Sequence, residues 1–206
     1  MVDFGFSSHQ FDEGARGFSI RKEGRLDMRM NQNQELDAFT VINTYEAEQL
    51  ADLFFHFGEL RNVRKIASII CMSREECPIT TTYDLIDVVK SLTPKRFENK
   101  FLAKIFQAIR IEVNNELMVL QSFLKQSVQV LNPGGRLVCI SYHSLEDRFV
   151  KRFIQSGNFE GKEEKDFYGN SLSKLRKIGK LIVPSQEELK DNPRARSAKL
   201  RIAEKR

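Results

Sequence analysis

Apolar residues recur at helical spacing through the middle of the chain. Four apolar stripes predict helices, and they cover residues 47–58, 63–72, 81–92 and 103–131. The first helix is expected to begin with a capping box of Asn43 and Glu46, and the third with one of Thr81 and Asp84. The fourth stripe is long and unbroken, which predicts a single helix. Residues 35–115 are therefore expected to form a compact helical unit.

The pattern changes at an Asn-Pro-Gly-Gly turn that follows the fourth stripe. Residues 136–141 form a short apolar run typical of a buried strand, and Ser144 with Asp147 predicts a capping box that opens another helix. Two later β-like stretches are expected to pair antiparallel at a sheet edge, and they are residues 180–183 and 198–203. This order of helix, turn, strand and helix indicates an α/β fold with a parallel sheet.

Length and composition restrict the class of protein. The chain has 206 residues and a hydrophobic content of 41%, enough for the core of one or two domains. The three cysteines lack zinc-site spacing, so we expect reduced thiols and no metal site. No apolar run approaches the ~18 residues that a membrane span needs, and the N-terminus has no signal-peptide pattern. We therefore expect a soluble cytoplasmic protein with no membrane partner, and the oligomeric state stays open.

Positive charge is concentrated at the C-terminal end. Residues 174–206 contain 11 Lys or Arg and 4 Asp or Glu, whereas the whole chain carries a net charge of only +5. A basic end on a nearly neutral body favours contact with a polyanion. A solvated basic surface is the alternative.

Three segments carry candidate chemistry. Residues 3–12, DFGFSSHQFD, place an acid, a glycine and two serines where a strand is expected to end. Open α/β sheets bind ligands at this end of their strands. An ordinary turn is the alternative for this segment. His143 follows the strand 136–141 and is a candidate acid or base, a base-stacking partner or a hydrogen-bonded turn residue. In residues 192–201, arginines alternate with small residues, which leaves guanidinium groups room to bind phosphates or to pair with acids of the body.

Six segments, taken in order, resemble one family. They are DFGFSSHQFD, ARGFSI, LDMRM, FQAIRIEVNNEL, NPGGRLVCISYHSLEDR and NPRARSAKLR. Their order is similar to that of the bacterial small-subunit (16S) rRNA cytosine-N4 methyltransferases, the RsmH or MraW family, from Asp3 almost to Arg206. The resemblance implies methyl transfer from S-adenosylmethionine to the exocyclic amine of one cytosine near the decoding centre. The implied partner is small-subunit ribosomal RNA or the 30S subunit.

The resemblance also implies a fold and a division into domains. The family has a Rossmann-like α/β methyltransferase sheet interrupted by an all-helical domain. We therefore expect residues 1–12 and 116–206 to form the methyltransferase domain. Residues 13–115 are expected to form a helical substrate-recognition insertion.

Individual residues receive roles from the same resemblance. Asp3 and Gln10 correspond to positions that contact S-adenosylmethionine. Asp3, Ser7 and Ser8 are candidates for orienting the target amine, so Asp3 is a candidate for both roles. His9 stands where the family usually has proline. The candidates for RNA contact are Arg194, Arg196, Lys199, Arg201 and His143.

One feature of the family has no counterpart here. A glycine-rich turn after the first strand of the sheet lets the backbone approach the cofactor, but the only adjacent glycines of this chain, Gly134 and Gly135, follow a helix. Only Met1 and Val2 precede Asp3. We therefore expect an N-terminally truncated methyltransferase domain that is impaired on its own. The alternatives are a non-catalytic RNA-binding module and an inactive fragment of the enzyme.

Overall fold

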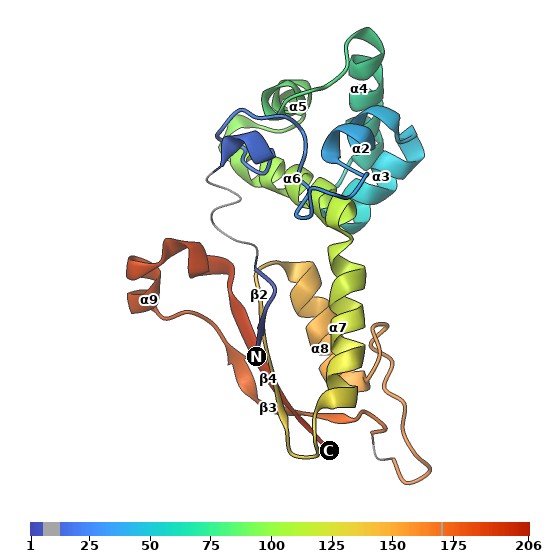
Figure 1. Ribbon diagram of the computed structural model, residues 1–206, viewed down its shortest axis with the longest axis vertical. Coiled ribbons are helices and arrows are strands. Elements are labelled where there is room, and N and C mark those ends of the chain that lie inside the picture. The colour runs from blue at the N-terminus through green and yellow to red at the C-terminus, as the bar shows by residue number, and fades with distance from the viewer. Residues whose placement is uncertain (6–12, 170) are drawn as a thin grey trace. The chain divides into compact units, whose positions relative to one another are not determined.

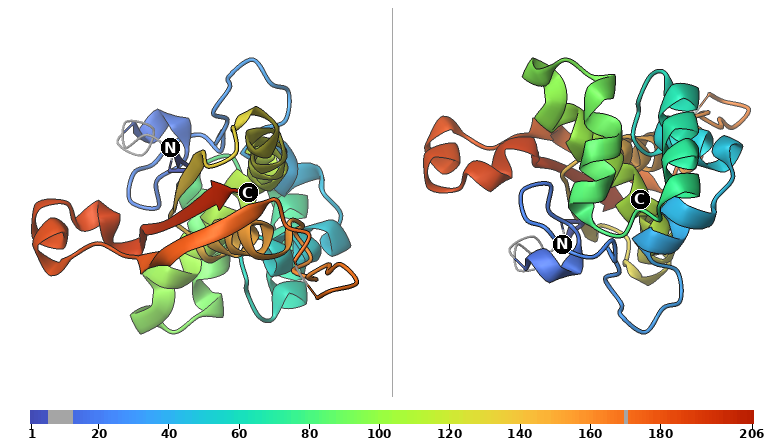
Figure 2. Two further views of the ribbon diagram at one scale, coloured as in Figure 1. Left: turned by 90° about the horizontal axis from the view of Figure 1, so that it is seen from below. Right: turned by 90° about the horizontal axis from the view of Figure 1, so that it is seen from above.

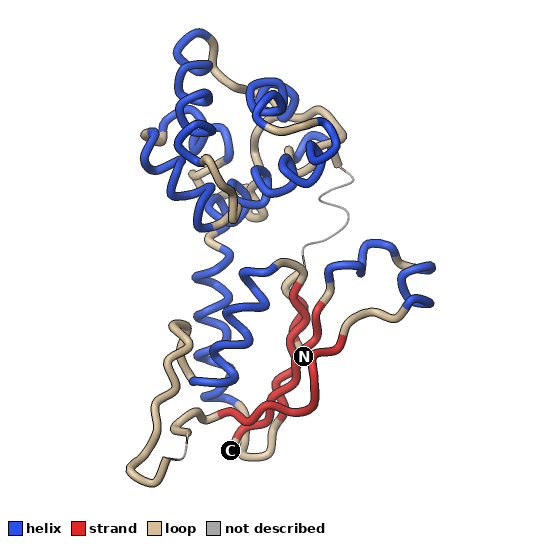
Figure 3. The backbone as a smooth tube through the Cα atoms, turned by 180° about the vertical axis from the view of Figure 1, so that it is seen from behind, coloured by secondary structure: helices blue, strands red, loops and turns tan. Residues whose placement is uncertain are grey.

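The protein is described by a computed structural model that covers residues 1–5, 13–169 and 171–206. Its chain divides into two compact units. Met1–Gly5 and Leu117–Arg206 form the sheet unit, and the intervening sequence forms the helical unit, described from residue 13 to residue 116. Figure 3 shows the strands, in red, within the sheet unit, while the helical unit consists of helices and loops.

The sheet unit is built on four strands in the order β1-β2-β4-β3. Their bounds are Val2–Asp3 for β1, Arg136–Ser141 for β2, Leu175–Ile182 for β3 and Lys199–Lys205 for β4. β1 lies parallel to β2, whereas β2 with β4 and β3 with β4 are antiparallel. The α/β class is therefore confirmed. The expectation of a parallel sheet holds for β1 with β2 but is wrong for β2 with β4, because β4 returns between β2 and β3.

Two helices cover one face of this sheet (Figure 1). They are α7 (Glu116–Val130) and α8 (Ser144–Ser156). Residues of β2 alternate between buried and partly exposed, as expected for a strand with one covered face. The core between sheet and helices is formed by Leu120, Leu124, Val128, Leu137, Cys139, Val150, Phe153, Ile154, Leu175 and Ala203.

The connection between β3 and β4 projects beyond the sheet. It contains α9 (Gln186–Asp191) and the 3-10 helix η4 (Pro193–Ser197), and we call residues 183–198 the arm (Figures 1 and 2). At its base, Ile182 pairs with Leu200, and Lys199 pairs with Ser141 at the end of β2. The arm therefore leaves the sheet at the end where β1 and β2 terminate.

The helical unit packs its helices around a separate core. Its elements are η1 (Gly14–Arg16), α2 (Ala38–Thr44), α3 (Ala47–His56), α4 (Val63–Glu76), α5 (Thr82–Val89), η2 (Lys90–Leu92), η3 (Lys95–Phe97) and α6 (Glu98–Asn114). Residues 13–37, which precede α2, also contribute to the core through fully buried Leu26 and Met28. The side-chain amide of Asn114 donates to the carbonyl of Met28 at 2.7 Å and fixes this segment against the end of α6.

Local signals predicted part of this architecture correctly. The strand at residues 136–141, the capping box of Thr81 and Asp84, and the antiparallel pairing of the last two strands are confirmed. The single helix over residues 103–131 is wrong, because Asn115 has a left-handed backbone with φ of 52° and separates α6 from α7. An asparagine tolerates this conformation better than most residues, so no glycine or proline marks the break.

Two predicted helix starts were displaced by a few residues. Asn43 lies inside α2, and the capping box of α3 is formed by Glu46 and Gln49. Helix α8 is capped by His143 with Glu146, and not by Ser144 with Asp147. Extended backbone at His143 makes it the N-cap.

Candidate functional site

The carboxyl ends of β1 and β2 lie together at one end of the sheet. Val2 pairs with Cys139 and Asp3 with Ile140, and the backbone N–H of Phe4 donates to the carbonyl of Ile140 at 3.0 Å. Because the two strands are parallel, Asp3 and the residues after Ser141 emerge at the same edge. This edge is the usual ligand-binding position of an open α/β sheet.

The Asp3 carboxylate is held by two hydrogen bonds. The Tyr142 hydroxyl donates to Oδ2 at 3.0 Å, and the backbone N–H of Gly5 donates to Oδ1 at 2.8 Å. Burial raises the pKa of Tyr142, and the hydrogen bond to Asp3 and its charge raise it further. Tyr142 therefore stays protonated and acts as a donor to Asp3. Asp3 itself is exposed, and each of its oxygens retains acceptor capacity for a ligand.

Gly5 completes this arrangement because a side chain at its position has no room. A Cβ atom there would lie 2.5 Å from Cε2 of Tyr142 and 2.9 Å from Oδ1 of Asp3. The Gly5 N–H reaches the carboxylate by a local contact between residues two apart, and the missing Cβ leaves room for the Tyr142 ring beside this backbone. Asp3, Gly5 and Tyr142 form one cluster, which we call the Asp3 cluster.

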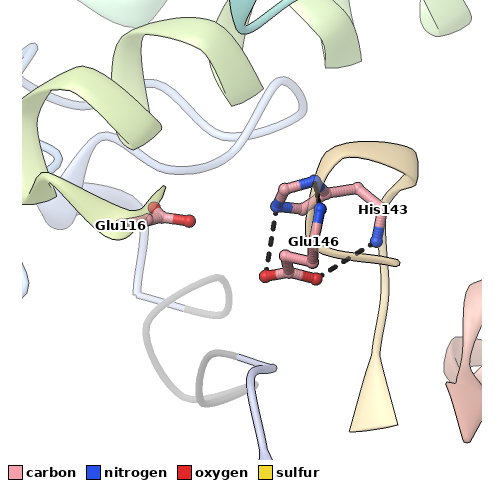
Figure 4. A group of neighbouring side chains, drawn as sticks. All are labelled: Glu116, His143 and Glu146. Atoms are coloured by element: carbon pink, nitrogen blue, oxygen red, sulfur yellow. Dashed lines mark hydrogen bonds and ion pairs between the residues drawn. The ribbon is translucent and has the colours of Figure 1, made fainter. Parts of the chain in front are cut away.

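His143 and Glu146 form the start of α8 (Figure 4). The Glu146 carboxylate accepts from the backbone N–H of Tyr142 at 2.8 Å and of His143 at 3.3 Å. In return, Nδ1 of His143 accepts from the backbone N–H of Glu146 at 3.4 Å, and Nε2 lies 3.1 Å from Oε1 of Glu146. His143 is therefore hydrogen-bonded through Nδ1 to the first turn of α8, which agrees with the interpretation of His143 as a hydrogen-bonded turn residue.

The charge of Glu146 is stabilised in spite of its burial. Its side chain is 5% exposed, and burial by itself would raise its pKa. The contacts with His143 and with the two backbone N–H groups outweigh burial and lower the pKa of Glu146. The carboxylate therefore caps the helix in its ionised form and fixes Tyr142 by its backbone, next to Asp3.

A second ion-paired group connects α8 to the base of the arm. Arg201 on β4 donates from Nε and Nη2 to the two oxygens of Asp147 at 2.7 and 3.1 Å, and Nζ of Lys199 lies 3.4 Å from the same carboxylate. Burial would raise the pKa of Asp147, but these cations, Arg201 above all, lower it. Asp147 is therefore a structural anion, and the two cations are committed to it.

Comparison with known proteins identifies the family. The sequence profile of the MraW methylase family matches residues 1–206. The chain belongs to the MraW methylase family. Relatives named "Ribosomal RNA small subunit methyltransferase H" include those of Flavobacterium johnsoniae (56% identical over 205 residues), Christiangramia forsetii (57% over 205 residues) and Amoebophilus asiaticus (52% over 206 residues). Each match covers 100% of this chain, and 68%, 68% and 66% of the respective relative.

The family resemblance inferred from the six segments is thus confirmed, and so is the enzyme class. Among the described helices of this MraW-family chain, none is both long and apolar enough to cross a membrane. Of the residues given roles by the resemblance, Ser7, Ser8 and Gln10 lie outside the described residues. Asp3 lies at the end of β1, as its position in the sequence suggested.

The basic candidates of this MraW-family chain fall into two groups. Lys199 and Arg201 are paired with Asp147, which matches the alternative that cations of this segment pair with acids. Arg194 and Arg196 lie on η4 in the arm and are exposed. The second pair is therefore more exposed than the first, which is partly buried.

Sequence reasoning missed Tyr142, and it noted Gly5 only as the glycine of residues 3–12, without its contact to the Asp3 carboxylate. Tyr142 directly follows the strand 136–141, so it was a visible neighbour of His143, but nothing local indicates its partner. The pairing of Val2 with Cys139 brings Tyr142 to Asp3, which is 139 residues away in the chain. A prediction of the β1–β2 register would have found both residues.

Proposed function

We propose that this MraW-family chain takes part in S-adenosylmethionine-dependent methylation of the exocyclic amine, N4, of a cytosine in small-subunit ribosomal RNA near the decoding centre. The observation that carries the proposal is the Asp3 cluster at the carboxyl ends of β1 and β2, in a chain whose relatives are named as rRNA methyltransferases. In this proposal the helical unit is the substrate-recognition insertion in a methyltransferase sheet of which this chain supplies part.

The Asp3 carboxylate fits the cofactor by its chemistry. An exposed carboxylate with free acceptor capacity binds ammonium or hydroxyl groups, and S-adenosylmethionine carries both. Asp3, with Gln10, would hold the cofactor, which when bound supplies an electrophilic methyl group on its sulfonium. Tyr142 and Gly5 hold Asp3 in one orientation, so less motion has to be lost when a ligand binds.

Activation of the target amine requires hydrogen-bond acceptors. The lone pair of a cytosine amine is delocalised into the ring, so the nitrogen is a poor nucleophile. Acceptors placed on its hydrogens favour a pyramidal nitrogen, and alignment with the methyl group supplies most of the remaining acceleration. Ser7 and Ser8 are our candidates for these acceptors, with Asp3 in this role if Gln10 alone holds the cofactor.

The ribosomal RNA has to present its base outside a helical stack. A cytosine amine inside a duplex is inaccessible, so the target is unstacked or flipped. The arm leaves the sheet at the end where Asp3 lies, and its exposed Arg194 and Arg196 suit contacts with phosphates beside that base. Lys199 and Arg201 would act indirectly, by fixing the base of the arm through Asp147.

Residues 1–206 by themselves should bind S-adenosylmethionine weakly. The 206 residues contain no glycine-rich turn that could cradle the cofactor, and the match covers 68% of the length of the Flavobacterium johnsoniae relative. Isothermal titration of this polypeptide with S-adenosylmethionine should therefore show no saturable heat at micromolar concentrations. Micromolar affinity would contradict this part of the proposal.

A hybrid enzyme tests the function itself. The 205 matched residues of the Flavobacterium johnsoniae relative are replaced by this chain, and transfer of a labelled methyl group into isolated small ribosomal subunits is measured. We expect labelled small-subunit rRNA with the hybrid and none with its Asp3→Asn variant. A folded hybrid without transfer would contradict the proposal.

A non-catalytic RNA-binding module is the second candidate. It is favoured by the exposed arginines of the arm and predicts RNA binding by residues 1–206 without any contribution to methyl transfer in the hybrid. Methyl transfer by the hybrid therefore separates the two functions, because only the first predicts it.

A further inference from the structure

An exposed aromatic ring lies among basic residues at the start of α6 in the helical unit. Phe97 ends η3 and is the N-cap of α6, and it is 49% exposed, whereas α6 buries most of its own large apolar side chains. The guanidinium of Arg96 lies over this ring, 4.6 Å from its centroid. Lys95 and Lys100 are exposed beside it in sequence. An aromatic ring that is left in solvent and stacked by an arginine presents flat surfaces suited to a planar ligand.

Two side chains of α6 hold the loop that follows α3. Lys104 donates from Nζ to the carbonyl of Glu59 at 3.0 Å, and Gln107 donates from Nε2 to the carbonyl of Phe57 at 2.9 Å. Lys100 lies one turn before Lys104 on this face, because residues four apart are neighbours on a helix. The loop that follows α3 is therefore fastened to the face of α6 that carries Lys100.

That loop leads directly into three further cations, Arg61, Arg64 and Lys65, all of which are exposed. Arg64 and Lys65 lie in the first turn of α4, and no acidic residue lies in that turn. Cations in a first helical turn are disfavoured by the helix dipole, so their placement lowers the stability of α4. Residues that break a local rule in this way are often kept for function.

No described residue neutralises the charges of this surface by an ion pair. None of its six exposed cations forms an ion pair with another described residue, and they are Arg61, Arg64, Lys65, Lys95, Arg96 and Lys100. In the sheet unit, by contrast, Lys199 and Arg201 are paired with Asp147. The six cations are thus available to an external anion.

We propose that the surface formed by Phe97 and these six cations binds single-stranded RNA, with a base stacked on the Phe97–Arg96 pair and the other cations on neighbouring phosphates. Stacking on aromatic rings and arginine planes, combined with basic side chains along the backbone, is how proteins hold unpaired nucleotides. The identity of that RNA as ribosomal rests on the proposed function. The RNA-binding surface itself rests on the residues named here.

Fluorescence anisotropy with a labelled single-stranded RNA of about 12 nucleotides, and with a duplex of the same length, tests the proposal on residues 1–206. Loss of one base–aromatic stack should weaken binding roughly 5- to 140-fold, which corresponds to about 1–3 kcal/mol. We expect this loss for Phe97→Ala, with most of the affinity retained in Phe97→Trp. The duplex, whose bases are already stacked, should bind less tightly than the single strand and respond little to Phe97→Ala.

The phosphate contacts have a separate signature. For single strands, log affinity decreases linearly with log salt concentration, and each phosphate contact removed makes this slope less steep by about 0.7. Arg64→Glu and Lys100→Glu should therefore flatten the slope, whereas Phe97→Ala should leave it unchanged. Lys162→Glu, the same charge change in a loop of the sheet unit that also carries Glu160, Glu163 and Glu164, is the control and should alter neither affinity nor slope.

Phe167→Ala is the matched control for the aromatic ring, because Phe167 is 99% exposed but lies in that acidic loop. The proposal is overturned if Phe167→Ala and Phe97→Ala have equal effects, if the wild-type chain does not bind the single strand, or if polyglutamate displaces the RNA as well as unlabelled RNA does. Methyl transfer by the hybrid enzyme is scored independently. Phe97-dependent binding without transfer would remove the proposed function alone, and transfer with Phe97-independent binding would remove this inference alone.

Discussion

Replacement of Arg201 by methionine tests whether the Asp147 ion pair anchors the arm. Arg201 and Asp147 are joined by two hydrogen bonds of 2.7 and 3.1 Å, and their side chains are only 14% and 12% exposed. Methionine removes the charge while it preserves much of the length of the side chain. Among the cations that the structure describes, Asp147 then keeps only Lys199 at 3.4 Å, and the side chain of Lys199 is 38% exposed.

The expected magnitude follows from this geometry. Loss of one partner from a fully buried pair costs roughly 3–5 kcal/mol, because the other charge is left without compensation. Lys199 and the residual exposure compensate Asp147 in part, so we expect a loss of about 2–3 kcal/mol. For a protein of this size, that corresponds to a fall in Tm of about 4–12 °C.

The difference between Arg201→Met and wild type should depend on pH in a defined direction. The folded state lowers the pKa of Asp147 below its ordinary value of 3.8, so the ion pair stabilises the fold fully above that pH. Its contribution is lost as the pH falls below 3.8 and through the lower pKa of the folded state. The two Tm values should therefore differ most near neutral pH and converge in acid.

Thermal unfolding followed by circular dichroism is the assay, because the chain contains no tryptophan for fluorescence. Arg176→Met is the matched control. Arg176 also pairs across β3 and β4, with Glu204 at 2.6 Å, but its side chain is 63% exposed, so no measurable change is expected. Equal shifts for the two variants, or an unchanged Tm for Arg201→Met at neutral pH, would refute the reasoning.

Three further predictions concern the Asp3 cluster and the core beneath it. Tyr142→Phe removes the hydroxyl that holds Oδ2 of Asp3 and should lower methyl transfer by the hybrid about tenfold with no change in Tm, because a hydrogen bond to a charged group contributes about 1.5 kcal/mol or more. A Tm loss that accounts for the lower rate would assign the hydroxyl to stability instead. Gly5→Ala places a Cβ 2.5 Å from the Tyr142 ring and should abolish methyl transfer by the hybrid. The double variant with Tyr142→Ala should recover part of the transfer, and no recovery would show that the ring is not the obstacle. Cys139 is 1% exposed, and burial raises the pKa of its thiol to about 12. A thiol reagent at neutral pH should therefore modify exposed Cys77 and leave Cys139 intact until the protein unfolds, and peptide mapping measures both.

Features encoded by neighbouring residues were predictable from the sequence. The apolar run 136–141 and the capping box of Thr81 and Asp84 need only residues close in the chain, and both are present. The break at Asn115 is also local, but its left-handed backbone is one that asparagine adopts without any change in the apolar period around it. Helical spacing alone therefore joined α6 and α7.

Features that depend on strand register were not predictable. Asp3 was found because its neighbours resemble a family motif, whereas Tyr142 was not, since the pairing of β1 with β2 alone makes it the partner of Asp3. The basic C-terminal end shows the same limit. Its charge was evident, but the assignment of Arg201 to Asp147, and not to RNA, depends on the position of β4 between β2 and β3.

The central claim is that Asp3 serves methyl transfer to the N4 position of a cytosine, and nucleoside mass spectrometry of small-subunit rRNA tests it most directly. Subunits treated with the hybrid enzyme and isotopically labelled S-adenosylmethionine are digested to nucleosides and compared with subunits treated with the Asp3→Asn hybrid. The account predicts labelled N4-methylcytidine with the first enzyme and none with the second. Label on another nucleoside, or equal N4-methylcytidine from both enzymes, would contradict it.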